Sequence, residues 1–186
     1  MRIDTFYKTE SEISYTNRIF QEIYFQKSIS KQEISKLLQL SLPTVGQSLK
    51  ELYTMRIIQK NGYFESTGGR KAEVISVASK AKVAIGVSLL REFITITALD
   101  LYGQPIKEKI CYISFERSDA YYRAFGKAVN QFIDELKYPD NAILGIGLAV
   151  QGLVSQDGQT IISGDLLGYT GTDRSVFQNN IRLPCR

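Results

Sequence analysis

The sequence predicts an α+β module followed by an α/β half-domain. Apolar residues follow helical spacing through much of the first eighty residues, and strand-like alternation takes over after them. The pattern changes near Ala78-Ser79-Lys80, so we expect two domains, residues 1–78 and residues 79–186. A hydrophobic content of 44% over 186 residues is enough to build a core in each.

Three helices are expected in the first domain. The first ends near Gln26, because apolar residues recur at mostly helical spacing from Ile13 to Tyr24. Ser30 and Glu33 have the spacing of a capping box, which opens the second helix. The apolar side of that helix consists of Ile34, Leu37 and Leu38.

The third helix begins after Ser41, which can cap it, and has Pro43 in its first turn. One side of this helix carries Val45, Leu49 and Leu52. Another side carries Thr44, Gln47, Ser48 and Glu51. A short helix, a tight turn and a polar-faced helix predict a helix-turn-helix, in which residues near the start of the last helix meet base edges in the major groove.

Several side chains of this motif are candidate DNA contacts. Gln47 suits a bidentate bond to adenine, whereas Thr44 and Ser48 suit either a base or a phosphate. Lys50 is expected to meet a phosphate. Ser41 and Lys60 complete the candidate set in this part of the chain. The alternative is that the polar positions are only the solvated face of a packed helix.

A β-hairpin is expected directly after the third helix. Its strands are Arg56–Lys60 and Glu73–Val77, with Asn61-Gly62 as a turn signal. A hairpin at this place makes the motif a winged helix-turn-helix. Its tip, Gly68-Gly69-Arg70-Lys71, pairs two glycines with two cations, and Arg70 can enter the minor groove, where negative potential is strongest. The alternative is a merely solvated turn.

The charge distribution supports an anionic partner for the first domain. Residues 1–80 hold 12 Lys and Arg against 8 Asp and Glu, whereas residues 81–186 hold 11 against 11. All of the excess positive charge therefore lies in one module, which suggests nucleic acid as its partner.

The absence of histidine argues against several classes of enzyme. It removes the usual general base and the usual serine or cysteine triads, and with two cysteines it makes a zinc site improbable. We therefore expect no catalytic residue, no metal and no cofactor. The two cysteines fit a reducing compartment, and neither a membrane helix nor a signal peptide is evident, so a cytoplasmic location is expected.

The second domain contains an α/β pattern. Its predicted strands are Val83–Leu89, Phe93–Leu99, Ile106–Ile113 and a buried, all-apolar Ile143–Val150. An amphipathic helix, Asp119–Leu136, lies between the last two strands. Its inward residues are Tyr122, Phe125, Val129, Phe132 and Ile133. This order describes a ribonuclease-H-like, or actin-like ATPase, half-domain.

Three segments together resemble the ROK family of repressors and sugar kinases. They read LLQLSLPTVGQSLKELYTMRII with STGGRKAEVISV, then AIGVSLLREFITITALDLYGQPI, then LGIGLAVQGLVSQDGQTIISGDLLGY. They are similar to the family's winged helix, to its first two strands and to its G-I-G-x-x-x-x-G-x-V-x-x-x-x-G stretch. The resemblance covers about residues 15–184 and implies a DNA-binding module before a sugar-sensing domain related to sugar kinases.

The resemblance also bears on catalysis. Kinases of the family carry Asp-x-Gly-Gly-Thr after the first strand, where backbone N–H groups wrap nucleotide phosphates. This chain has Ser88-Leu89-Leu90-Arg91-Glu92 there, without the acidic residue or either glycine that close phosphate approach requires. The family's catalytic aspartate and zinc-binding cysteines follow a segment like Ile181-Arg182-Leu183-Pro184, so we expect an incomplete first lobe, either as a truncated product or as a fragment.

The resemblance finally suggests an effector site and a function. Gly152 and Asp165 lie in segments that approach the sugar in relatives, and Asp165 could accept hydroxyl hydrogen bonds. The leading hypothesis is a homodimeric repressor of carbohydrate-related genes that binds operator DNA and responds to a sugar or sugar phosphate, away from membranes. The alternatives are a ROK-type sugar kinase with an appended winged helix, and a protein-interaction or assembly module.

Overall fold

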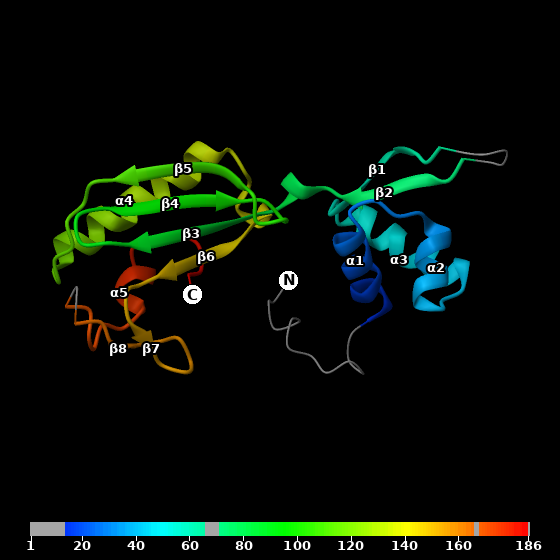
Figure 1. Ribbon diagram of the computed structural model, residues 1–186. Coiled ribbons are helices and arrows are strands. Elements are labelled where there is room, and N and C mark those ends of the chain that lie inside the picture. The colour runs from blue at the N-terminus through cyan, green and yellow to red at the C-terminus, as the bar shows by residue number, and fades with distance from the viewer. Residues whose placement is uncertain (1–13, 66–70, 166–167, 186) are drawn as a thin grey trace. The chain divides into compact units, whose positions relative to one another are not determined.

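The computed structural model describes residues 14–65, 71–165 and 168–185. The chain divides into two compact units, one reaching to Ala81 and the other starting at Lys82 (Figure 1). The division lies close to the boundary expected at Ala78. We call the two parts unit 1 and unit 2. No helix among the described residues is long and apolar enough to cross a membrane.

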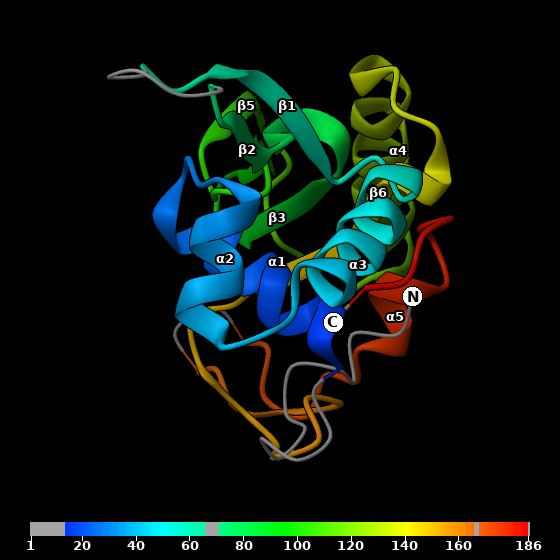
Figure 2. The ribbon, with the colours of Figure 1, turned by 90° about the vertical axis from the view of Figure 1, so that its right-hand side faces the viewer.

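Unit 1 consists of three helices and a pair of antiparallel strands, and Figure 2 looks onto the helices. The elements are α1 (Tyr15–Gln26), α2 (Lys31–Leu38), α3 (Leu42–Thr54), β1 (Ile58–Tyr63) and β2 (Glu73–Val77). Both α1 and α2 pack on α3. A short 3-10 turn, Ser79–Ala81, ends the unit.

Serine side chains determine where the three helices begin. The hydroxyls of Ser14, Ser30 and Ser41 each accept a hydrogen bond from a backbone N–H in the first turn of their helix. The capping box predicted for α2 is present, because Glu33 Oε2 also accepts from the Ser30 backbone N–H at 2.8 Å. The predicted positions of α2 and α3 are therefore confirmed.

The core of unit 1 is apolar and drawn from all five elements. Its buried side chains are Ile19, Ile23, Ile29, Ile34, Val45, Leu49, Leu52, Ile58, Val74, Ile75 and Val77. Leu37 differs from the prediction, since it is 55% exposed. With only eight residues in α2, the apolar side that reaches the core is limited to Ile34 and the partly buried Leu38.

The β1–β2 pair corrects one local prediction. Asn61 and Gly62 do not form the turn but lie inside β1, where the register with β2 shifts between Lys60 and Tyr63. Gly62 has φ of +81°, the left-handed conformation that glycine adopts readily at a bulge. The Asn-Gly pair therefore forms an irregularity within a strand that continues to Tyr63.

Unit 2 is built on a four-stranded mixed sheet covered on one face by a long helix (Figure 1). Its main elements are β3 (Val83–Leu89), β4 (Ile94–Leu99), β5 (Pro105–Cys111), α4 (Asp119–Leu136) and β6 (Ile143–Ala149). Smaller elements are a 3-10 turn (Asp140–Ala142), β7 (Leu153–Val154), β8 (Ile161–Ser163) and α5 (Ser175–Gln178). The sheet order is β5-β4-β3-β6, with only the β3–β6 pair parallel.

Alternation along the central strands explains the core of unit 2. Every second residue of β3 and β4 is buried, and these side chains belong to the same apolar cluster as those of α4. The five inward residues predicted for α4 are all buried. Two charged hydrogen bonds also join β5 to α4. The Glu135 carboxylate accepts from the Lys107 ammonium at 2.7 Å and from the Lys109 ammonium at 2.8 Å.

One segment of unit 2 differs from what its composition suggested. The strand predicted as wholly buried, β6, is at the edge of the sheet; only Ile143 and Ile146 of it are buried, and Leu144 is 45% exposed. The stretch Ser88–Glu92 completes a hairpin between β3 and β4, in which Leu89 is buried and the backbone N–H of Leu90 donates to Phe93 O at 3.1 Å. It is a strand-turn-strand segment of the core.

Candidate nucleic-acid interface

The solvent-facing side of α3 presents Gln47 and Lys50. Both residues are exposed, and within the described part of the chain neither side-chain head has a hydrogen-bond or ion-pair partner. Ser41 and Thr44 are used differently. The Ser41 hydroxyl caps α3 by accepting from the Thr44 N–H and lies 2.8 Å from Thr44 Oγ1. Both hydroxyls therefore hold the start of the helix, leaving Gln47 and Lys50 as its exposed polar side chains without a partner in the described structure.

The placement of Ser48 corrects the predicted contact set. Ser48 is only 6% exposed, so its hydroxyl is not presented to a partner molecule. The reason is helical geometry, since Ser48 lies three residues after Val45 and four before Leu52, which are both buried. A small polar side chain thus occupies the apolar side of α3.

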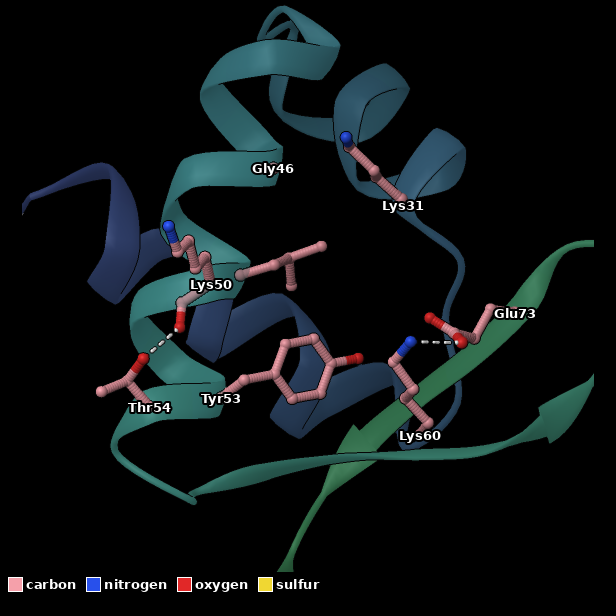
Figure 3. Close-up of a pocket in the computed structure, with 8 residues that line it drawn as sticks. Lys31, Gly46, Lys50, Tyr53, Thr54, Lys60 and Glu73 are labelled. Atoms are coloured by element: carbon pink, nitrogen blue, oxygen red, sulfur yellow. Dashed lines mark hydrogen bonds and ion pairs between the residues drawn. The ribbon is translucent and has the colours of Figure 1, made fainter.

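A groove lies beside the exposed face of α3, between this helix, the start of α2 and the strand pair (Figure 3). Its volume is about 510 Å³. The residues that line it are Lys31, Gly46, Leu49, Lys50, Tyr53, Thr54, Lys60 and Glu73. Three lysines and one glutamate are among these residues, and we call this feature the α3 groove.

Lys60 and Glu73 form an ion pair across β1 and β2. Lys60 Nζ lies 2.9 Å from Glu73 Oε1, and the lysine side chain is 64% exposed. The hydrogen bond to the Glu73 carboxylate raises the pKa of the Lys60 ammonium above its ordinary value. Exposed pairs of this kind contribute little to folding, so the pair mainly fixes where the two charges lie.

Gly46 lets the Lys31 ammonium approach α3 closely. A Cβ at position 46 would lie 2.7 Å from Lys31 Nζ, which is closer than nonbonded atoms come. Glycine in the middle of a helix costs about 1 kcal/mol relative to alanine. Lys31 Nζ is the end of a flexible side chain, so a Cβ at position 46 would displace the ammonium at little cost, and Figure 3 shows Lys31 reaching from α2 toward Gly46.

Tyr53 extends from α3 toward the Lys60–Glu73 pair (Figure 3). Its hydroxyl oxygen is buried and has no hydrogen-bond partner among the described residues. Burial raises the pKa of the Tyr53 phenol. A buried hydroxyl without a partner is uncommon in folded proteins and is costly, so a hydrogen bond formed to this group would be stabilising.

Two predicted DNA contacts remain, Lys71 and Arg70. Lys71 is exposed. Arg70 lies outside the described residues. Of the predicted DNA contacts, Lys50 and Lys60 therefore both line the α3 groove.

The two residues predicted to approach an effector lie close together in unit 2. A Cβ at Gly152 would lie 2.2 Å from Ser163 O, so only glycine allows this approach of β7 to the end of β8. Asp165 lies two residues after Ser163 and is exposed. Its Oδ1 accepts from the Thr170 hydroxyl at 2.5 Å, so this carboxylate stabilises the loop in which it lies.

Sequence reasoning missed Lys31, Gly46, Tyr53 and Glu73. One signal was available, because Gly46, Lys50 and Tyr53 recur at helical spacing and an isolated glycine inside a helix usually has a packing or functional reason. No comparable local signal existed for Lys31 or Glu73, which reach the groove from other elements.

Comparison with known proteins shows relatives among sugar repressors. The chain is 26% identical over 168 residues to the xylose repressor of Caldicellulosiruptor bescii, an alignment that covers 89% of this chain and 42% of that protein. It is 22% identical to the xylose repressor of Bacillus subtilis over 89% of this chain and 43% of that protein. It is 30% identical to the DNA-binding transcriptional dual regulator NagC of Escherichia coli, over 69% of this chain and 32% of NagC.

No protein-family model matches the chain. A solved structure does share its fold. It is described as a ROK family transcriptional regulator, a homologue of the Escherichia coli MLC protein, and it superposes with a TM-score of 0.66 at 15% identity over 91% of this chain and 43% of that one. The chain spans about two fifths of the length of the xylose repressors that it matches. It is a relative of sugar repressors over most of its own length and has the fold of a ROK family transcriptional regulator, as its sequence motifs predicted.

Proposed function

We propose that this chain is the DNA-binding part of a transcriptional repressor of carbohydrate genes. Unit 1 is a winged helix-turn-helix, with α3 as the helix that enters the major groove and β1–β2 as the wing. The observation that carries the proposal is that α3 presents the unpartnered heads of Gln47 and Lys50 next to a groove lined by lysines. The Gln47 amide can bond a base edge, whereas the lysines beside it can bond phosphates. This arrangement matches the two kinds of contact that DNA-binding proteins make.

A filter-binding titration tests this proposal. The full 186-residue chain is mixed with a labelled pool of random-sequence duplexes at a series of salt concentrations. The logarithm of the binding constant should fall linearly with the logarithm of the salt concentration, with a slope of about 0.9 per phosphate contacted. Absence of retention at the lowest salt, with the protein folded by circular dichroism, would rule out DNA binding by this chain.

We further propose that unit 2 is a ribonuclease-H-like half-domain without catalytic activity. The support is local, since the Ser88–Glu92 segment is a tight hairpin with a buried Leu89, and a phosphate loop needs close backbone approach. An assay for ATP-dependent phosphorylation of hexoses should give no turnover. Measurable transfer that depends on the chain would favour a sugar kinase instead.

The effector and the dimer belong to the same proposal. Relatives named for xylose and N-acetylglucosamine make these sugars the first probes. In the proposed repressor Gly152 and Asp165 lie in the loop that responds to the effector, and two chains bind paired half-sites in the operator. Either sugar should change duplex affinity, and Asp165→Asn should abolish that response while leaving sugar-free affinity intact.

A further inference from the structure

The α3 groove combines features that point to a phosphate. Three lysines line it, and the Tyr53 hydroxyl in it is buried without a hydrogen-bond partner among the described residues. Ammonium and phenol donors together suit an oxygen-rich anion, and lysine binds phosphate as a compact point charge. Glu73 does not suit such a ligand, because a carboxylate beside a phosphate is repelled.

The carboxylate of Glu73 already occupies the donor that a phosphate would use. Lys60 Nζ lies 2.9 Å from Glu73 Oε1, as Figure 3 shows with a dashed line. An oxygen of a phosphate would need the same ammonium protons. Binding therefore requires Lys60 to exchange one anion for another, and leaves Glu73 without its counter-ion.

We propose that the α3 groove is a site for one DNA phosphodiester, held by Lys31, Lys60 and the Tyr53 hydroxyl, and that Glu73 is a built-in competitor for that phosphate. This inference rests on the proposed function. Glu73 weakens binding to every duplex alike, because the phosphate carries no sequence information. The sequence-dependent contacts of α3 then account for a larger share of the affinity for an operator.

The competition gives a quantitative expectation. In the native chain, Lys60 must leave Glu73 before it neutralises a phosphate, whereas in Glu73→Gln its ammonium has no carboxylate to leave. Lys60 neutralises the same phosphate in both, so the slope of log affinity against log salt should change little while the affinity rises. Affinity for random-sequence duplex at low salt should rise up to about fivefold, the strength of an exposed ion pair.

A double-mutant cycle separates this exchange from a general effect of charge. The full chain is measured as native protein, Glu73→Gln, Lys60→Gln and the double variant, with random-sequence duplex as probe. The gain from Glu73→Gln should vanish when Lys60 is already Gln. Glu65→Gln, which removes a charge from an exposed residue without an ion pair among the described residues, is the control and should gain less. Equal gains in both Lys60 backgrounds would overturn the proposal.

Two further variants test the other groups of the site. Tyr53→Phe should lower duplex affinity about tenfold without lowering the thermal midpoint, because the native hydroxyl has no partner to lose. Gly46→Ala should displace the Lys31 ammonium and weaken binding, and this loss should disappear when Lys31 is already Ala. Duplex binding unaffected by both variants would assign the phosphate to another surface.

Inorganic phosphate at constant ionic strength distinguishes the source of the anion. If Glu73→Gln tightens inorganic phosphate binding but not duplex binding, the groove holds a free anion and the proposal is overturned. If the native chain and all variants fail to bind duplex, the proposed function fails. If the native chain binds duplex and the cycle shows no coupling, only the present inference fails. Should Glu73→Gln be unfolded by circular dichroism, Glu73→Ala takes its place in the cycle.

Discussion

At the scale of single residues, α3 divides its polar side chains between folding and recognition. Ser41 and Thr44 hold the start of the helix, and Ser48 lies in the buried side. Gln47 and Lys50 remain exposed. Two polar side chains one residue apart, Gln47 and Ser48, therefore have opposite environments, and this contrast supplies a matched pair of variants.

Gln47→Ala should reduce sequence preference, because the glutamine amide can bond two edges of an adenine. A selection of duplexes from a random pool should give a strong consensus with the native chain and a weaker one at a single position with the variant, a loss of about 1–3 kcal/mol of discrimination. Ser48→Ala should leave the consensus unchanged, since this hydroxyl is buried. A changed consensus with Ser48→Ala would show that the buried placement is wrong.

At the scale of elements, the capping interactions decide where helices start. Ser30 is 4% exposed and takes part in both bonds of the capping box of α2. Ser30→Ala should lower the free energy of unfolding by about 1 kcal/mol. Ser28→Ala is the control, because Ser28 is exposed and outside the helix. Urea unfolding followed by circular dichroism measures both, and equal effects would contradict the role of the cap.

The contact between β5 and α4 makes the stability of unit 2 depend on acid pH. The hydrogen bonds from Lys107 and Lys109 lower the pKa of Glu135 from 4.5 to about 2. A carboxyl with a lowered folded-state pKa stabilises the fold above pH 4.5, and this contribution is lost as the pH falls toward 2. The thermal midpoint of Glu135→Gln should therefore lie below that of the native chain at neutral pH and approach it in acid.

Glu116→Gln is the matched control for this pH series. Glu116 also lies in unit 2, and within the described residues it has no salt bridge; it accepts a hydrogen bond from the Ser118 hydroxyl at 3.2 Å, which a glutamine oxygen can also accept. Its variant should follow the native chain across the whole range. A constant gap between the native chain and Glu135→Gln at all pH values would show that the two lysines do not hold this carboxylate.

At the scale of the whole molecule, positive charge and the candidate interface coincide in unit 1. Residues 1–80 have an excess of basic groups, whereas the rest of the chain is balanced. DNA should therefore protect lysines of unit 1 from acetylation, in particular Lys50, Lys60 and Lys71. The exposed Lys127 and Lys137 of unit 2 should stay reactive. Mass spectrometry of the full chain with and without duplex measures this, and uniform protection would argue against an interface confined to unit 1.

Local rules were sufficient for most elements of the fold. Caps, periodicity and strand alternation predicted α3, β3 and α4 because each depends on residues close together in the sequence. Prediction failed where a neighbouring element decides the outcome. The composition of β6 indicates a buried strand, but its place at the edge of the sheet leaves part of it exposed.

The sequence by itself determined the order of elements, the basic character of the first part and the motifs shared with sugar repressors, because these are properties of neighbouring residues and of composition. Only the tertiary structure decided that Ser48 is buried and that Lys31, Tyr53, Lys60 and Glu73 line one groove. These four residues come from α2, α3, β1 and β2. Their meeting depends on how those elements pack, which no local pattern contains.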